Sequence, residues 1–197
     1  MSDRVFNVLF LCKGNSARSI IAEAYLRSRN NSRLRAFSAG STPLGYVQPL
    51  ALDVLREAGV STEGLRSKSW NEFSGPNAPV MDLVINLCEE TRGEDCPSWP
   101  GRPATAYWAI PDPAAIKGTE IQKRVAYAHA LTYLKRRADF LEHFSPEQLA
   151  NLANTRARRS TTTRGLPLRP CPRILQTNLS CRCALAGGRG IPVQERA

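Results

Sequence analysis

The sequence has no apolar run approaching the roughly 20 residues that a membrane span needs. Its beginning, with acidic Asp3 and a short apolar patch that leads into a polar loop, lacks the layout of a signal peptide. The two histidines, His129 and His143, have no cysteine or histidine beside them at metal-ligand spacing, and no internal repeat is visible. These absences favour a cytoplasmic protein that needs neither a metal nor a membrane.

Positive charge is concentrated at one end of the chain. Residues 1–150 carry 18 basic and 16 acidic side chains, whereas residues 151–197 carry 9 and 1, out of a net charge of +10. After about residue 154 the sequence is rich in Arg, Pro, Gly and Thr and loses hydrophobic periodicity. We therefore predict a domain at 1–153 and a basic tail at 154–197, which we expect to be disordered. The tail lacks aromatic residues for base stacking, so we do not expect a dedicated nucleic-acid binder.

Short runs rich in Val, Leu and Phe alternate with helical patterns in the domain. The apolar runs predict strands at 4–11, 34–40, 81–88 and 104–110. The helical patterns predict helices at 16–29, 49–59 and about 120–144. We expect Ser16 or Ser19 to cap the first helix, and the residues expected to face inward on the last are Val125, Leu131, Leu134 and Leu141. Strands that alternate with helices predict an α/β fold with a four-stranded parallel sheet flanked by helices.

A cysteine stands six residues before an arginine at three places. These are Cys12 to Arg18, Cys96 to Arg102 and Cys183 to Arg189. A loop that binds a tetrahedral oxyanion needs free backbone amides, a following helix N-terminus and an arginine for bidentate contact. Prolines remove amides from the second stretch, and the third has neither a strand before it nor a helix after it. Only the first stretch has a predicted strand, a loop without proline and a predicted helix.

The first stretch therefore predicts an oxyanion cradle with a nucleophile. The amides, the helix dipole and Arg18 favour the thiolate form of Cys12, which can then attack the central atom of the anion. Ser19 lies close enough in sequence to hydrogen-bond that thiolate. The residues predicted to form the cradle are Cys12, Lys13, Gly14, Asn15, Ser16, Ala17 and Arg18. We expect Asn15 to brace the loop, and Lys13 either adds charge at the mouth or is simply solvated.

The stretch "VLFLCKGNSARSIIAEA" resembles the signature of the low-molecular-weight protein tyrosine phosphatase superfamily, and within it the arsenate reductases built on that fold. The resemblance covers roughly residues 5–150 and includes "FSAGS", "LRSKSW", "CPSWPG" and "YWAIPDPA". It implies that Asp112, in an Asp-Pro loop late in the domain, protonates the leaving group. It also implies arsenate or phosphate as the bound oxyanion.

Further cysteines separate the two activities of this superfamily. A phosphatase hydrolyses a cysteinyl phosphate with one thiol, whereas a reductase must obtain two electrons from thiols. Cys88 ends the third predicted strand, so it should lie near Cys12 at the same edge of the sheet. Cys96 follows across a polar loop. This arrangement favours an arsenate reductase; the alternative is a phosphatase that hydrolyses phosphotyrosine.

The resemblance to thioredoxin-coupled arsenate reductases implies a relay of disulfides. Cys12 attacks arsenate, Cys88 displaces arsenite, and Cys96 then attacks the disulfide between the other two. The spacing between Cys88 and Cys96 is one residue longer than in that pattern. The reductant is therefore open: thioredoxin, glutathione with glutaredoxin, or mycothiol, with Cys96 dispensable in the last two cases. The resemblance implies no tightly bound cofactor.

Overall fold

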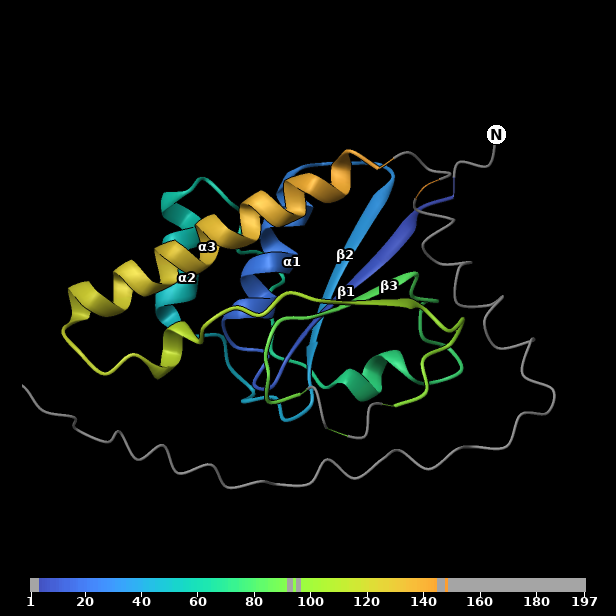
Figure 1. Cartoon of the computed structure of the whole chain (residues 1–197), viewed down its shortest axis with the longest axis horizontal. Coiled ribbons are helices and arrows are strands. Elements are labelled where there is room, and N and C mark those ends of the chain that lie inside the picture. Colours follow the sequence, from blue (N-terminus) through green and yellow to red (C-terminus); the bar gives the residue numbers. More distant parts are fainter. Residues whose placement is uncertain (1–3, 92–93, 95–96, 145–147, 149–197) are drawn as a thin grey trace, which may run out of the picture. The chain divides into compact units, whose positions relative to one another are not determined.

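One parallel sheet carries the strands in the order β2-β1-β3-β4 (Figure 1). They are β1 (Phe6–Cys12), β2 (Leu34–Gly40), β3 (Leu83–Asn86) and β4 (Ala104–Tyr107). The structure is a computed structural model that describes residues 4–91, 94, 97–144 and 148. All four strands occur where the apolar runs predict them, although β3 and β4 are shorter than expected. Among the described residues, no helix is long and apolar enough to cross a membrane.

The α-helices are α1 (Arg18–Ser28), α2 (Pro49–Glu57) and α3 (Glu120–Glu142), and two short 3-10 helices are η1 (Trp70–Phe73) and η2 (Pro113–Ala115). The predicted serine cap of α1 is wrong. Ala17 occupies the N-cap position and makes no side-chain hydrogen bond there. Ser16 precedes that position, and Ser19 lies inside the first turn, where its hydroxyl contacts Cys12 instead.

Alternating side chains of β1 enter two hydrophobic clusters. Phe6, Val8 and Phe10 belong to the larger one, which also contains side chains of all three α-helices. Leu9 and Leu11 belong to the smaller one, which contains the aromatic residues of η1. Because successive strand residues point to opposite faces, both faces of the central strand are covered. This burial fixes β1 and, with it, the position of Cys12 at its end.

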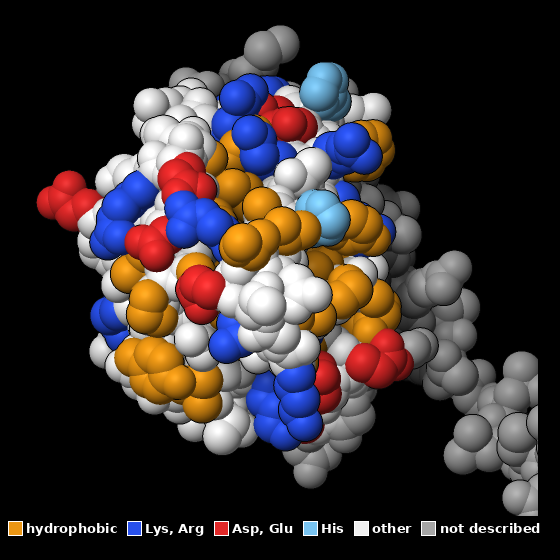
Figure 2. Space-filling view, turned by 90° about the vertical axis from the view of Figure 1, so that its left-hand side faces the viewer, with side chains coloured by type: hydrophobic (Ala, Val, Ile, Leu, Met, Phe, Trp, Pro, Cys, Tyr) orange, Lys and Arg blue, Asp and Glu red, His pale blue; other side chains and the backbone are white. Residues whose placement is uncertain are grey.

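The inward face of α3 differs from the prediction at one position. Leu131, Leu134 and Leu141 are buried, but Val125 is 46% exposed. Six residues separate Val125 from Leu131, which turns the helix by about 240° and places the valine on the outer side. Figure 2 shows hydrophobic side chains at the surface beside Lys and Arg side chains on the face that it draws.

Candidate active site

The Cys12 loop, residues 12–18, joins the end of β1 to the first turn of α1. Three of its carbonyl oxygens accept hydrogen bonds from backbone amides of the segment 42–48 at 2.9 to 3.0 Å. These carbonyls belong to Lys13, Gly14 and Ser16. Because the N–H of a peptide unit points opposite to its C=O, the amides that follow these carbonyls point away from that segment.

Gly40 of β2 allows the loop to lie against the sheet. Cys12 and Gly40 are partners in the register of β1 and β2. A Cβ atom on Gly40 would stand 2.5 Å from the carbonyl oxygen of Lys13 and 2.9 Å from the amide nitrogen of Asn15. Asn15 itself has a φ of 41°, a left-handed conformation that asparagine tolerates. Close backbone contact therefore fixes the shape of the loop.

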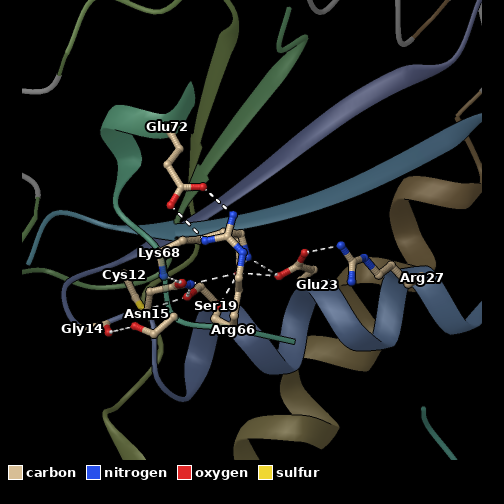
Figure 3. Close-up of polar contacts among 11 residues, drawn as sticks. Cys12, Gly14, Asn15, Ser19, Glu23, Arg27, Arg66, Lys68 and Glu72 are labelled. Atoms are coloured by element: carbon tan, nitrogen blue, oxygen red, sulfur yellow. Dashed lines mark hydrogen bonds and ion pairs between the residues drawn. The ribbon is translucent and has the colours of Figure 1, made fainter. Parts of the chain in front are cut away.

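A cavity of about 250 Å³ opens on the loop. Six of the seven residues predicted to hold an oxyanion line it, as does Asp112. Asn15 is the exception, because its side chain is fully buried behind the loop and bonded to Ser19 and Ser38 (Figure 3). The cavity therefore brings Asp112 together with Cys12 and Arg18, although Asp112 lies 94 positions from Arg18 in the sequence.

Arg18 lines the cavity and is held there by residues that follow β3 and β4. Its buried guanidinium donates to the carbonyl oxygen of Ile110 at 3.2 Å and pairs with Asp112 through Nη2 and Oδ2 at 3.0 Å. Glu90 Oε2 lies 3.8 Å from Nη1. Asp112 also caps η2, because its Oδ1 accepts from the amide of Ala114 at 3.1 Å. The predicted acid is thus placed beside the predicted anion-binding arginine.

Cys88 follows β3 and is completely buried. Leu11 pairs with Asn86 in the register of β1 and β3, and the ladder continues from the Leu87 amide to the Leu11 carbonyl. Burial raises the pKa of the Cys88 thiol, the hydrogen bond with Thr91 and the charge of Arg18 lower it, and a charge on Cys12 raises it. The ionisation of Cys88 therefore depends on both central groups of the cavity, and the thiols of Cys12 and Cys88 are both free.

Comparison with known proteins identifies the family of this chain. Residues 7–151 match the low molecular weight phosphotyrosine protein phosphatase family. The chain belongs to this family. An arsenate reductase of Bacillus licheniformis is 34% identical over 117 residues, which cover 59% of this chain and 80% of that protein. The arsenate reductases predicted from the motif are therefore confirmed as relatives.

Solved structures agree with the fold. A structure described as an arsenate reductase in the phosphate binding state has a TM-score of 0.57 and 26% identity, and the match covers 75% of this chain and 99% of that one. A low molecular weight protein tyrosine phosphatase from T. tengcongensis has a TM-score of 0.55 and 22% identity, with 71% and 99% covered. The predicted four-stranded phosphatase-like fold is confirmed.

Some predicted parts of this phosphatase-family chain lie outside the described residues. Cys96 is one of them, as is the basic tail at 154–197 with its cysteines. The boundary of the domain at residue 153 therefore stays a prediction. Within the part of the chain that the structure describes, no three histidine, cysteine, aspartate or glutamate side chains form a group that could hold a metal.

Sequence reasoning missed several polar residues behind and around the cavity. Glu90 lines the cavity, and Ser38, Glu23 and Lys68 extend the hydrogen bonds of Asn15 into the interior. One signal was present in the sequence. Polar residues recur every fourth position from Ser19 through Glu23 to Arg27, and that spacing places them on one line of α1.

Proposed function

We propose that this protein is an arsenate reductase in which Cys12 is the nucleophile. The observation that carries the proposal is a second buried free thiol, Cys88, which follows β3, the strand that pairs with β1 and its terminal Cys12. Reduction of arsenate to arsenite requires two electrons, and two thiols supply them when they form a disulfide. A phosphatase of the same fold needs only the first thiol. The relationship to arsenate reductases supports the same choice.

The first step is attack on arsenate. The Cys12 thiolate forms a sulfur–arsenic bond, and one arsenic–oxygen bond breaks. The oxygen that leaves takes a proton from Asp112 and departs as water. Arg18 and the loop amides hold the remaining oxygens. In this structure Asp112 pairs with Arg18, so an anion that binds the guanidinium competes with this carboxylate.

The second step transfers the electrons. Cys88 loses its proton and attacks the sulfur of Cys12, which forms a Cys12–Cys88 disulfide. The electron pair of the sulfur–arsenic bond passes to arsenic, so that As(V) becomes As(III) and arsenite leaves. We propose that Cys96 then attacks the sulfur of Cys88, which frees Cys12 and leaves a Cys88–Cys96 disulfide for an external thiol to reduce.

The electron donor is a cytoplasmic thiol system, and the proposal needs no tightly bound cofactor. Thioredoxin and glutathione with glutaredoxin are the two main candidates, and mycothiol is a third. They predict different roles for Cys96. An external dithiol protein accepts the Cys88–Cys96 disulfide, whereas a small thiol can resolve an earlier intermediate and make Cys96 dispensable.

The second candidate function is hydrolysis of phosphotyrosine through a cysteinyl phosphate on Cys12. The cavity supports this function because it places Asp112, the proposed acid for the leaving group, beside Arg18. Because the cradle is common to both reactions, we expect weak phosphatase activity in either case.

The deciding experiment measures arsenite formation with thioredoxin and, separately, with glutathione plus glutaredoxin. The wild type and Cys88→Ser are compared, with aryl phosphate hydrolysis as the matched second activity. We expect Cys88→Ser to lose arsenite formation and to retain aryl phosphate hydrolysis within about threefold. Rapid aryl phosphate turnover without arsenite formation from any reductant would overturn the reductase proposal.

A mass map after turnover tests the relay itself. We expect a disulfide between Cys88 and Cys96 in the wild type and one between Cys12 and Cys88 in Cys96→Ser. Full arsenite formation by Cys96→Ser would remove Cys96 from the mechanism without affecting the role of Cys88.

A further inference from the structure

Two acidic side chains line the cavity of Cys12, and both lie beside Arg18. Asp112 Oδ2 pairs with Nη2 at 3.0 Å, whereas Glu90 Oε2 lies 3.8 Å from Nη1. Asp112 is the proposed acid, so it carries a proton when it acts, but Glu90 has no part in the steps proposed above. A second carboxylate in a cavity for an anion needs a reason, because it repels the charge that the cavity attracts.

A short turn after β3 places Glu90 at the cavity. Asn86 Oδ1, at the end of the strand, accepts from the Cys88 amide at 3.1 Å and from the Thr91 hydroxyl at 2.6 Å. These two hydrogen bonds hold the backbone on both sides of Glu90. The Glu90 side chain is 52% exposed, so it stands where the cavity opens to solvent.

Glu90 presents an ionised carboxylate to the cavity at neutral pH. A hydrogen bond from its own backbone amide lowers the pKa of Glu90 most, and partial burial raises it. The charge of Arg18, the side chain of Cys88 and the charge of Lys13 lower this pKa further. An ionised carboxylate can only accept hydrogen bonds, so Glu90 offers acceptors and no donor to an occupant of the cavity.

The guanidinium of Arg18 keeps protons for an anion on the side of Glu90. Nη1 and Nη2 carry two protons each, of which one is donated to the Ile110 carbonyl and one to Asp112. The distance of 3.8 Å is too long for a hydrogen bond, so Glu90 leaves the second proton of Nη1 available. An anion oxygen that accepts from Nη1 at about 2.9 Å can at the same time lie within hydrogen-bond distance of Oε2.

An oxygen in that position needs a proton of its own. An unprotonated oxygen would place like charges together, whereas a protonated oxygen donates to the carboxylate. Arsenate and inorganic phosphate keep a proton at neutral pH and sulfate has none, while a phosphotyrosine group, with a second pKa of about 6, has lost its last proton. We infer that Glu90 is a specificity-determining residue, which accepts a hydrogen bond from the bound anion and so favours oxyanions that keep a proton over sulfate and aryl phosphates.

The inference rests on the proposed arsenate reduction for its substrate, but its test needs no turnover. Calorimetry on the full chain measures the dissociation constants of inorganic phosphate and of sulfate at about pH 8 and constant ionic strength. Both anions then carry nearly two negative charges and differ mainly in the proton. Glu90→Gln removes the charge and supplies a donor. Glu89→Gln is the matched control, because this neighbouring carboxylate accepts from the Tyr107 hydroxyl and is not among the residues that line the cavity.

We expect the wild type to bind phosphate about tenfold more tightly than sulfate. Glu90→Gln should strengthen sulfate binding by about tenfold and change phosphate binding by less than about threefold, because an amide can donate to an unprotonated oxygen. Glu89→Gln should retain both wild-type constants. Equal binding of the two anions by the wild type would overturn the inference, and so would an unchanged ratio in Glu90→Gln that thermal unfolding shows to be folded.

The turnover of aryl phosphate gives a second measurement of the same preference. We expect Glu90→Gln to raise kcat/KM for aryl phosphate by about tenfold, and a lower value than in the wild type would count against the inference. A narrowed ratio of phosphate to sulfate binding in Glu90→Gln supports the role of Glu90 even where the wild type forms no arsenite. Failure of the proposed reductase activity is therefore distinguishable from failure of the inference.

Discussion

The surroundings of Cys12 and Cys88 differ in the direction of one hydrogen bond. Both cysteines are buried at the carboxyl ends of neighbouring strands, and each sulfur contacts a hydroxyl, at 2.9 Å for Ser19 and 3.2 Å for Thr91. Ser19 accepts from the Asn15 amide and is left with its proton for sulfur. Thr91 donates to Asn86 Oδ1 at 2.6 Å.

The acceptor of the Thr91 proton is fixed by the backbone. Asn86 Oδ1 also accepts from the amide of Cys88 at 3.1 Å, which identifies this atom as the oxygen. The hydrogen bond with Thr91 lowers the pKa of Cys88, but burial raises it by more. Burial therefore favours a neutral thiol at Cys88. A neutral Cys88 suits a thiol that attacks only after Cys12 has reacted with the anion.

The largest effect should follow removal of the first thiol. We expect Cys12→Ser to lower both arsenite formation and aryl phosphate hydrolysis by about 10⁴-fold or more, because a serine hydroxyl in this setting is a far weaker nucleophile. Initial rates of both reactions measure it. Substantial residual activity would remove the distinction between the two thiols.

The next effect concerns the anion contact beside Cys12. We expect Arg18→Lys to lower kcat/KM for arsenate and for aryl phosphate by about 10²-fold, because an ammonium cannot reproduce the bidentate fork. Steady-state kinetics check this value. A similar exchange at exposed Arg56 should change neither reaction, and a near-normal Arg18→Lys would show that the loop amides suffice.

The rate of arsenite release should depend on pH, because this step requires the Cys88 thiolate. Because burial raises the pKa of Cys88, its reactive thiolate is scarce at neutral pH and becomes more abundant as the pH rises. We expect arsenite release in a single turnover to increase up to about tenfold per pH unit between pH 6 and 8. Aryl phosphate hydrolysis, which bypasses Cys88, should not share this rise. A flat arsenite profile would contradict the assigned order of the two thiols.

The smallest effects compare the two hydroxyls directly. We expect Ser19→Ala to slow alkylation of Cys12 at pH 7 by about tenfold, because it removes a donor to the thiolate. Thr91→Val should change arsenite release by less than about threefold, since its hydroxyl donates elsewhere. Equal effects of the two substitutions on their neighbouring thiols would show that the proton directions are the same.

Local sequence determined the first half of the active site. An apolar run, a loop without proline and a helical pattern place Cys12 and Arg18 at a strand end, and Gly40 ends the neighbouring strand. The backbone geometry of these residues determines the shape of the cradle. The inward face of α3 was predicted except at Val125, where the helical period was read too broadly.

Only the tertiary structure decided which groups support the two thiols. Lys68 and Glu23 are 45 positions apart, and Asp112 reaches Arg18 across 94 positions, so no local pattern joins them. Ser19 shows the same limit: the sequence predicted it as a helix cap, but in the fold its hydroxyl contacts Cys12 and Asn15. A hydrogen bond acquires a direction only when all its neighbours are present, and here those neighbours come from β2, from α1 and from the segment that contains Lys68. The sequence by itself specified the nucleophile and its loop, whereas the packed fold determined the direction of the proton that Cys12 meets.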